Sequence, residues 1–229
     1  MTNCQFKHTP LQPLQKYDIV SNTRYGKRIY TINKPCGTVL TFPSITTILG
    51  AQEKDWLKQW QQSLGKAKAE KEKNRCAKRG EIVHTAIESY LNNQPFGSEL
   101  PVPERKLFNQ IKPKLNRINN IYTQEEALFS EGFKIAGRVD CIGEYDGIPS
   151  IIDFKSSTSV KNDQLIQDYY LQCTAYAMMF YELYEVLIPQ IVIIMCVEKG
   201  MVPLVFKKSV EDYVLPLTER INNYYKGAN

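Results

Sequence analysis

An aspartate in the middle of an apolar strand is the feature that most limits how this chain can fold. Asp153 lies within SIIDFK (150–155), whose apolar residues are typical of a buried strand. A buried carboxylate without a partner is energetically costly, so this side chain needs a neighbouring cation or hydrogen-bond donor. Because alternate residues of a strand share a face, Asp153 and Lys155 are expected to point to the same side of the sheet. A simple Asp–Lys pair at the rim of the sheet would also fit this pattern.

A second acidic residue, Asp140, ends the segment GRVD (137–140) in another apolar strand. The Asp146-Gly147 turn signal predicts that this strand and the next form a hairpin, in which paired residue numbers sum to about 293. Asp140 would then face Asp153, and two opposed carboxylates repel each other. A divalent cation such as Mg²⁺ between them would remove the repulsion. The alternative is that one aspartate belongs to a bulge and faces solvent.

The order of helical and strand patterns predicts an α/β fold, with one central mixed β-sheet flanked by helices. Residues 1–24 are expected to form an N-terminal arm and residues 25–229 a single domain, in which 25–78 hold a β-hairpin and a polar helical region and 79–229 hold the core. The expected strands are 25–31, 38–42, 125–130, 133–145, 150–155, 190–198 and 202–207. The expected helices are 52–74, 80–92, one ending near 120, 163–187 and 210–225.

Three further features of the sequence limit the class of protein to which this chain can belong: its charge, its cysteine spacing and its N-terminal residues. The net charge of +5 suits a polyanionic partner without requiring one. None of the six cysteines forms a C-x-x-C pair, so neither a zinc ribbon nor an iron–sulfur cluster has an evident framework. MTNCQFKHTP has no signal-peptide or transit-peptide pattern, and the longest apolar run, Ile191–Val197, is too short to span a bilayer. The expectation is a soluble cytoplasmic protein with reduced thiols and no membrane contact.

Further polar side chains stand where they could join the two aspartates. His84 lies on a helix beside an apolar stripe, where a lone histidine is more often packed than a ligand. Gln172 and Tyr176 lie one helical turn apart on a core-facing stripe, which also fits a helix edge. Glu125 and Glu126 begin the first strand of the core, and one of them is expected to face the other acids.

A run of basic residues precedes His84 along the chain. Its members are Lys66, Lys68, Lys71, Lys73, Arg75, Lys78 and Arg79. Such a run could line a channel that guides single-stranded DNA to the site. It also fits a solvated helix in which Glu70 and Glu72 pair with lysines at helical spacing. Trp56 and Trp60, just before it, are expected in the core rather than as base-stacking platforms.

Taken in order, these segments resemble a known nuclease family. Arg79-Gly80 with His84, then Glu125, then GRVD, then Asp153-Phe154-Lys155, then Gln172 with Tyr176, have the order and spacing of the RecB-type nucleases of the PD-(D/E)XK superfamily. The segments 42–49, 60–91 and 137–157 are similar to the mitochondrial genome maintenance exonuclease group and to related phage exonucleases. The likeness covers most of the chain from about Tyr25 onward. It implies the PD-(D/E)XK core, with the helices before His84 forming an arch over the active site.

The resemblance also implies a metal centre. His84, Asp140, Asp153 and the backbone carbonyl of Phe154 would bind the ion, Mg²⁺ with Mn²⁺ as a substitute. Glu125 would support the metal through water or as a neighbour of its ligands, with Glu126 as the alternative. The cluster-bearing branch of the family has a C-terminal cysteine triplet that this sequence lacks, so no iron–sulfur cluster is expected.

The implied reaction is hydrolysis of DNA phosphodiester bonds from free ends of single strands. Lys155 would orient the attacking water and offset negative charge on the phosphorane, while Gln172 and Tyr176 would position the site and the DNA backbone. No P-loop and no Ser–His–Asp order is evident, so NTP hydrolysis and covalent catalysis lack support. A structure-specific endonuclease on the same core and a non-catalytic DNA-binding module are the alternatives. A helicase, polymerase or single-strand-binding protein is an expected partner, in DNA repair, recombination or degradation.

Overall fold

A five-stranded sheet forms the centre of the computed structural model, which describes residues 6–52, 62–63, 65–95 and 100–227. The strand order is β4-β5-β6-β7-β8. These strands are β4 (Ile118–Ser130), β5 (Ile135–Tyr145), β6 (Ile148–Ser157), β7 (Gln190–Val197) and β8 (Leu204–Ser209). Strands β6 and β7 run parallel and the other neighbours antiparallel, so the predicted mixed sheet is confirmed.

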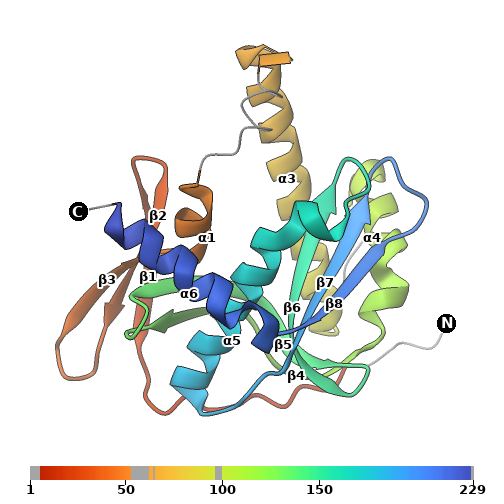
Figure 1. Cartoon of the computed structure of the whole chain (residues 1–229). Coiled ribbons are helices and arrows are strands. Elements are labelled where there is room, and N and C mark those ends of the chain that lie inside the picture. Colours follow the sequence, from red (N-terminus) through yellow and green to blue (C-terminus); the bar gives the residue numbers. More distant parts are fainter. Residues whose placement is uncertain (1–5, 53–61, 64, 96–99, 228–229) are drawn as a thin grey trace.

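Helices cover both faces of this sheet (Figure 1). The helices are α3 (Lys66–Leu91), α4 (Val102–Leu115), the short η1 (Asp163–Ile166), α5 (Gln167–Tyr184) and α6 (Glu211–Lys226). One core lies between the sheet and α5 with α6, and the other lies between the sheet and α3 with α4. Alternate residues of β7 divide between them, Ile191 and Ile193 in the first core and Val192 and Ile194 in the second. Both faces of β7 are buried, which fits its apolar sequence from Ile191 to Val197.

A smaller antiparallel sheet stands beside the central one. It consists of β1 (Asp18–Arg24), β2 (Lys27–Asn33) and β3 (Val39–Pro43), and α1 (Ile45–Gly50) follows. The sequence predicts the β2–β3 hairpin but places the residues of β1 in an N-terminal arm. That assignment was wrong for 18–24, because all but one of these residues are exposed and show no apolar alternation. Tyr25 and Gly26, with φ of 51° and 73°, make the tight turn into β2.

The start of the described chain is held against the core. The N–H of Thr9 donates to the carbonyl of Ile121 at 2.8 Å, and the N–H of Ile121 donates to the carbonyl of Lys7 at 2.9 Å. Phe6 is buried edge-on to the ring of Tyr90 on α3, with ring centroids 5.0 Å apart. The Asn93 side chain accepts from the N–H of Phe6 at 2.8 Å and donates to its carbonyl at 2.9 Å.

Helix α3 is continuous where the sequence predicts a boundary at Gly80. A glycine inside a helix costs about 1 kcal/mol relative to alanine. Here the cost is offset because the residues after it, including Val83 and Ile87, are buried against the sheet. The N-terminal half of α3 extends beyond the sheet (Figure 1). The expected helix 52–74 falls partly outside the described residues, since 53–61 and 64, with Trp56 and Trp60, are not described.

Strand β4 is longer than the sequence indicates. The preceding helix ends at Leu115 instead of near 120, and β4 begins at Ile118 instead of 125. Pairing with β5 shifts register between Asn119 and Thr123, which breaks the alternation by which a strand is recognised. None of the helices in the described part of the chain has the length and apolar composition needed to cross a membrane.

Phe6→Ala is expected to lower the free energy of unfolding by about 3 kcal/mol, because it leaves a cavity beside Tyr90. Equilibrium urea denaturation would measure the change. Leu14→Ala, an exposed apolar residue of the same segment, is the matched control and should be nearly neutral. Equal losses for both variants would show that the Phe6 contact does not stabilise the fold.

Candidate metal centre

A polar cleft of about 640 Å³ opens between the small sheet and helix α3. Strand β2 contributes Arg28 and Tyr30 to one wall, and α3 contributes His84 to the other. Strands β4 and β5, helix α5 and the start of α1 supply the remaining surface, with Arg138 and Asp140 from β5. The cleft therefore gathers side chains from segments far apart in the sequence.

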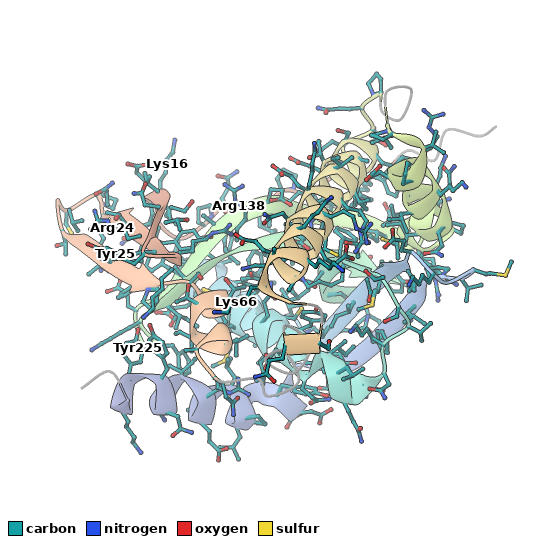
Figure 2. All side chains as sticks on the ribbon, turned by 90° about the horizontal axis from the view of Figure 1, so that it is seen from above. Lys16, Arg24, Tyr25, Lys66, Arg138 and Tyr225 are labelled. Carbon is teal, nitrogen blue, oxygen red and sulfur yellow. The ribbon has the colours of Figure 1, made fainter. Side chains whose placement is uncertain are left out.

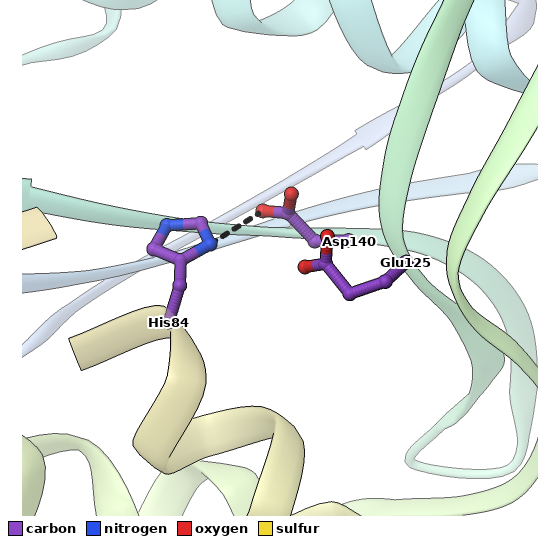
Figure 3. A group of neighbouring side chains, drawn as sticks. All are labelled: His84, Glu125 and Asp140. Carbon is purple, nitrogen blue, oxygen red and sulfur yellow. Dashed lines mark ion pairs between the residues drawn. The ribbon is translucent and has the colours of Figure 1, made fainter. Parts of the chain in front are cut away.

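His84, Glu125 and Asp140 come together at this cleft (Figure 3). Each offers one ligand atom, and the three atoms lie within 4.8 Å of one another. Nδ1 of His84 lies 3.7 Å from Oδ2 of Asp140. Burial raises the pKa of Glu125, and the charge of Asp140 raises it further. Two repelling carboxylates and an imidazole nitrogen are a donor set that suits a divalent cation.

Glu125 reaches this cluster because β4 is locally irregular. Its φ of 50° lies in the left-handed region, which costs a non-glycine residue roughly 1–2 kcal/mol. Its two neighbours, Gln124 and Glu126, stay paired with Cys141 and Val139 of β5, so Glu125 lies across from Asp140. Glu126 instead accepts a hydrogen bond from the Tyr184 hydroxyl. Of the two glutamates that the sequence leaves open, Glu125 is the one at the cluster.

Asp140 links the cluster to strand β6. Its Oδ2 accepts a hydrogen bond of 2.9 Å from the backbone N–H of Phe154. The β5–β6 pairing joins Cys141 to Ile152 and Ile142 to Ile151, which is the register predicted by hairpin counting. The observed pairing ends at Cys141, one residue before Asp140. The two aspartates are close enough for the charge of Asp140 to raise the pKa of Asp153.

Asp153 is buried and both of its oxygens have neighbours. Its side chain is 1% exposed, and it forms an ion pair with the ammonium group of Lys155. Nε2 of Gln172 donates to Oδ1 of Asp153 at 3.3 Å. Burial raises the pKa of Asp153 to about 6, with Asp140 adding to the rise and Lys155 opposing it. Burial would lower the pKa of Lys155, but the carboxylates of Asp153 and Asp140 outweigh it and raise that pKa.

Gln172 and Tyr176 brace this pair from helix α5. Nε2 of Gln172 also donates to the Tyr176 hydroxyl at 3.0 Å, and both side chains border the cleft. Tyr176 packs so closely on Gly137 that a Cβ at that position would lie 2.6 Å from its Cε1. The glycine of the GRVD segment is thus required by this close approach. Lys155 also lies over the ring of Tyr169, 4.9 Å from its centroid.

The clustered residues differ from the ligand set that the resemblance implies. Glu125 joins His84 and Asp140 in this group, which does not include Asp153. The oxygens of Asp153 contact Lys155 and Gln172. The part played by the Phe154 carbonyl stays a prediction, since the contact described for this residue is made by its N–H. The donor chemistry still fits the implied divalent ion, because carboxylate oxygens and an imidazole nitrogen converge.

The basic residues of α3 divide between two sides of the helix. Arg75 contacts Glu72 at 2.7 Å and Glu198 at 2.7 Å, and the buried Arg79 also pairs with Glu198. These contacts differ from the predicted role in DNA binding, because they anchor α3 to the end of β7. Lys68, seven residues before Arg75, is on the same side of the helix.

Two of the lysines on α3 are aligned with the cleft. Lys66 and Lys73 precede Gly80 at seven-residue steps, and Gly80 borders the cleft, so the three positions form one row along the helix. Both lysines are exposed. Lys71 and Lys78 are also exposed, but they form a separate row that lies more than about 100° around the helix from this one.

Two cationic residues of the cleft were not assigned a role from the sequence. Arg138 is two residues before Asp140 on β5, and one of its nitrogens lies 3.8 Å from a Glu125 oxygen. Strand alternation with Asp140 would have placed it on the same face. Arg28 borders the cleft from β2, and no local signal connects that strand to the central sheet.

The chain is similar to one curated nuclease. It is 30% identical over 149 residues to the mitochondrial genome maintenance exonuclease 1 of Mus musculus. The matched region is 59% of this chain and 43% of the mouse protein, so the chain spans less than half of that relative's length. No protein-family model matches the chain.

Glu125→Gln is expected to weaken Mn²⁺ binding at least about tenfold, because it removes one of the clustered carboxylates. Isothermal titration calorimetry at constant pH would measure the affinity. Glu126→Gln is the matched control, since the neighbouring amide can still accept the hydrogen bond from Tyr184 and should leave metal binding unchanged. A loss of Mn²⁺ affinity in Glu126→Gln, with none in Glu125→Gln, would show that Glu126 and not Glu125 is the metal ligand.

Proposed function

We propose that this chain is a metal-dependent DNA exonuclease of the PD-(D/E)XK type, which hydrolyses phosphodiester bonds from free ends of single-stranded DNA. The observation that carries the proposal is the His84–Glu125–Asp140 cluster in a polar cleft beside the Asp153–Lys155 ion pair. Partial similarity to a mouse protein that is named as an exonuclease supports the same reaction class.

The proposed ion is Mg²⁺, with Mn²⁺ as a substitute and without an iron–sulfur cluster. His84, Glu125 and Asp140 would hold it, and Asp153 and the Phe154 carbonyl are the further ligands that the family resemblance implies. When bound, the ion supplies Lewis acidity and lowers the pKa of a bound water. Because imidazole favours transition metals over Mg²⁺, Mn²⁺ is expected to bind more tightly.

Lys155 has the charge to act on the phosphate and lies near the carboxylates of Asp153 and Asp140. Its raised pKa keeps the ammonium protonated at neutral pH, so it serves as a cation and not as a general base. A fixed positive charge at a site that excludes water stabilises the negative charge that develops on the phosphorane. Asp153 holds this ammonium group, and Gln172 holds Asp153. Gln172 and Tyr176 are therefore proposed as positioning residues.

Single-stranded DNA is proposed to approach along helix α3. Lys66 and Lys73 extend the cleft-facing row of the helix toward its N-terminal end, beyond the sheet. Spaced lysines can contact successive phosphates without reading sequence. Lys71 and Lys78 form a separate exposed row on α3 and are also proposed to contact DNA, whereas Lys68, Arg75 and Arg79 are proposed to stabilise the helix.

Action on free ends distinguishes this proposal from an endonuclease on the same core. Its biological setting is proposed as DNA repair, recombination or degradation in the cytoplasm, or in the host cytoplasm if the gene belongs to a phage. A helicase, polymerase or single-strand-binding protein is the proposed partner, because the chain carries no motif for unwinding DNA.

The protein is expected to shorten end-labelled linear single-stranded DNA in the presence of Mg²⁺ and to leave a closed single-stranded circle intact. Lys155→Ala should lower the rate at least about 100-fold, because it removes the fixed charge from the transition state. Denaturing gel electrophoresis measures the product lengths, and labels at the two ends give the polarity. Lys226→Ala, an exposed lysine at the end of α6, is the control and should retain full activity.

Cleavage of the circle would replace the exonuclease with an endonuclease. If neither substrate is cleaved while DNA binding persists, the protein is a DNA-binding module. Full activity after addition of a chelator would contradict metal dependence.

The double variant Lys66→Gln with Lys73→Gln is expected to weaken binding of single-stranded DNA. The slope of log affinity against log salt should fall by about 1.4, since each phosphate contact contributes about 0.7 for a single strand. Fluorescence anisotropy at several salt concentrations measures this slope. Lys68→Gln on the opposite side of α3 is the control, and an equal change there would show that the DNA does not follow the cleft-facing row.

A further inference from the structure

The tip of the β1–β2 hairpin combines a bare aromatic ring with three cations. Tyr25 is 103% exposed, at the first position of the two-residue turn. Arg24 and Lys27 flank it as a cross-strand pair, and Arg28 follows on β2. All three cationic residues are exposed. Within the described part of the chain, no acidic side chain forms an ion pair with Arg24 or Lys27.

These features weaken the hairpin instead of stabilising it. Tyr25 has a φ of 51°, and tight hairpin turns prefer asparagine, aspartate or glycine there because larger residues are strained. Like charges directly opposite each other on paired strands repel. A fully exposed ring buries no apolar surface. Three local costs without a contact in the fold are typical of a surface that binds something outside the chain.

The hairpin tip is connected to the cleft by strand β2. Arg28 and Tyr30 border the cleft, and the same strand leads outward to Lys27 and the turn. Figure 2 shows Arg24 and Tyr25 at the outer end of the small sheet, with Arg138 between them and α3. Three residues of extended strand span roughly 10 Å, which equals about three base-pair steps of DNA. The hairpin tip is thus within reach of a nucleic acid that lies in the cleft.

We propose that this tip binds the junction at which DNA changes from duplex to single strand. Tyr25 stacks on the last base pair of the duplex, and Arg24 and Lys27 contact the phosphates on either side. The inference rests on the proposed function, since the single strand in the cleft sets the side on which the duplex lies. It adds a contact surface for the duplex beside the single strand, at the tip of the β1–β2 hairpin, to the proposed activity.

A duplex end fits this surface better than a continuous single strand does. Proteins that follow single strands use several aromatic rings in succession, one for each base. On the β1–β2 hairpin, Tyr25 is exposed whereas Tyr30 is buried, so the exposed surface of this hairpin provides one ring. One ring matches the single free π-face at the end of a base-pair stack. Two cations beside it match the two backbones that meet there.

Tyr25→Asn tests the stacking contact without weakening the turn, because asparagine is favoured in the left-handed conformation. Binding is measured by fluorescence anisotropy in EDTA, which prevents cleavage, with a single strand and with the same strand ending in a stable duplex. The wild type should bind the junction more tightly than the single strand. Tyr25→Asn should lower the affinity for the junction about fivefold or more and leave the affinity for the single strand unchanged. Tyr25→Phe keeps the ring and should bind the junction as the wild type does.

Arg24→Gln with Lys27→Gln should lower the salt slope for the junction by about two, the value for two phosphate contacts on duplex DNA. Wild-type binding of the junction by Tyr25→Asn, with an unaltered thermal midpoint, would overturn the proposal. Equal losses on both DNAs would overturn it as well, since the tip would then contact the single strand. Because the assay needs no cleavage, failure of the nuclease proposal would appear separately, as intact DNA in Mg²⁺ with the junction preference retained.

Discussion

The buried carboxylate of Asp153 constrains the arrangement of the elements around it. A carboxylate that is 1% exposed requires partners, and it obtains one from its own strand and one, Gln172, from helix α5. A hydrogen bond to a charged group typically contributes about 1.5–3 kcal/mol, so a shift of α5 that removed the Gln172 contact would destabilise the fold by about that amount. Since Gln172 also holds Tyr176, which packs on Gly137 of β5, the charge ties a helix to two strands.

The side chains of the candidate metal centre are positioned by different kinds of contact. Asp140 is fixed by the sheet, through its hydrogen bond to the backbone of Phe154. His84 lies on helix α3, and the position of this helix depends on the contacts of Arg75 and Arg79 with Glu198. Those ion pairs lie on the side of α3 away from the cleft, so the geometry of the imidazole depends on residues that do not touch the ligands. Part of the positive charge of α3, on Arg75 and Arg79, therefore positions the helix itself.

Local patterns in the sequence predict the centre of the sheet well. The Asp146-Gly147 turn has positive φ at both residues, 54° and 78°, which fixes the β5–β6 register and brings Asp140 toward Asp153. The alternation that sets Asp153 and Lys155 on one face is also local, and their contact confirms it. Periodicity of this kind cannot reveal an irregular backbone. Nothing around Glu125 signals its left-handed conformation, so the choice between the two glutamates needed the structure.

Contacts between residues far apart in the sequence explain the other differences between the sequence-based predictions and the structure. Glu198 follows Arg79 by 119 positions, and no spacing rule links an acid at the end of one strand with a helix so distant in sequence. For this reason Arg75 and Arg79 look like free cations in the sequence. Strand β1 was missed because its pairing with β2, and not apolar alternation, makes it a strand. Helix α3 passes through Gly80 because tertiary packing outweighs the weak propensity of one residue.

The N-terminal segment that lies along β4 has a consequence for how the protein behaves in solution. β4 is an edge of the five-stranded sheet, and uncovered edges pair with other chains and promote aggregation. Lys7 and Thr9 occupy the backbone groups of Ile121 on that edge, and Phe6 closes the apolar surface next to it. A shortened chain that begins after Thr9 would leave the backbone groups of Ile121 unpaired at this edge and would expose the apolar surface next to Phe6. A few residues that lie far from the cleft thus cover part of the sheet edge.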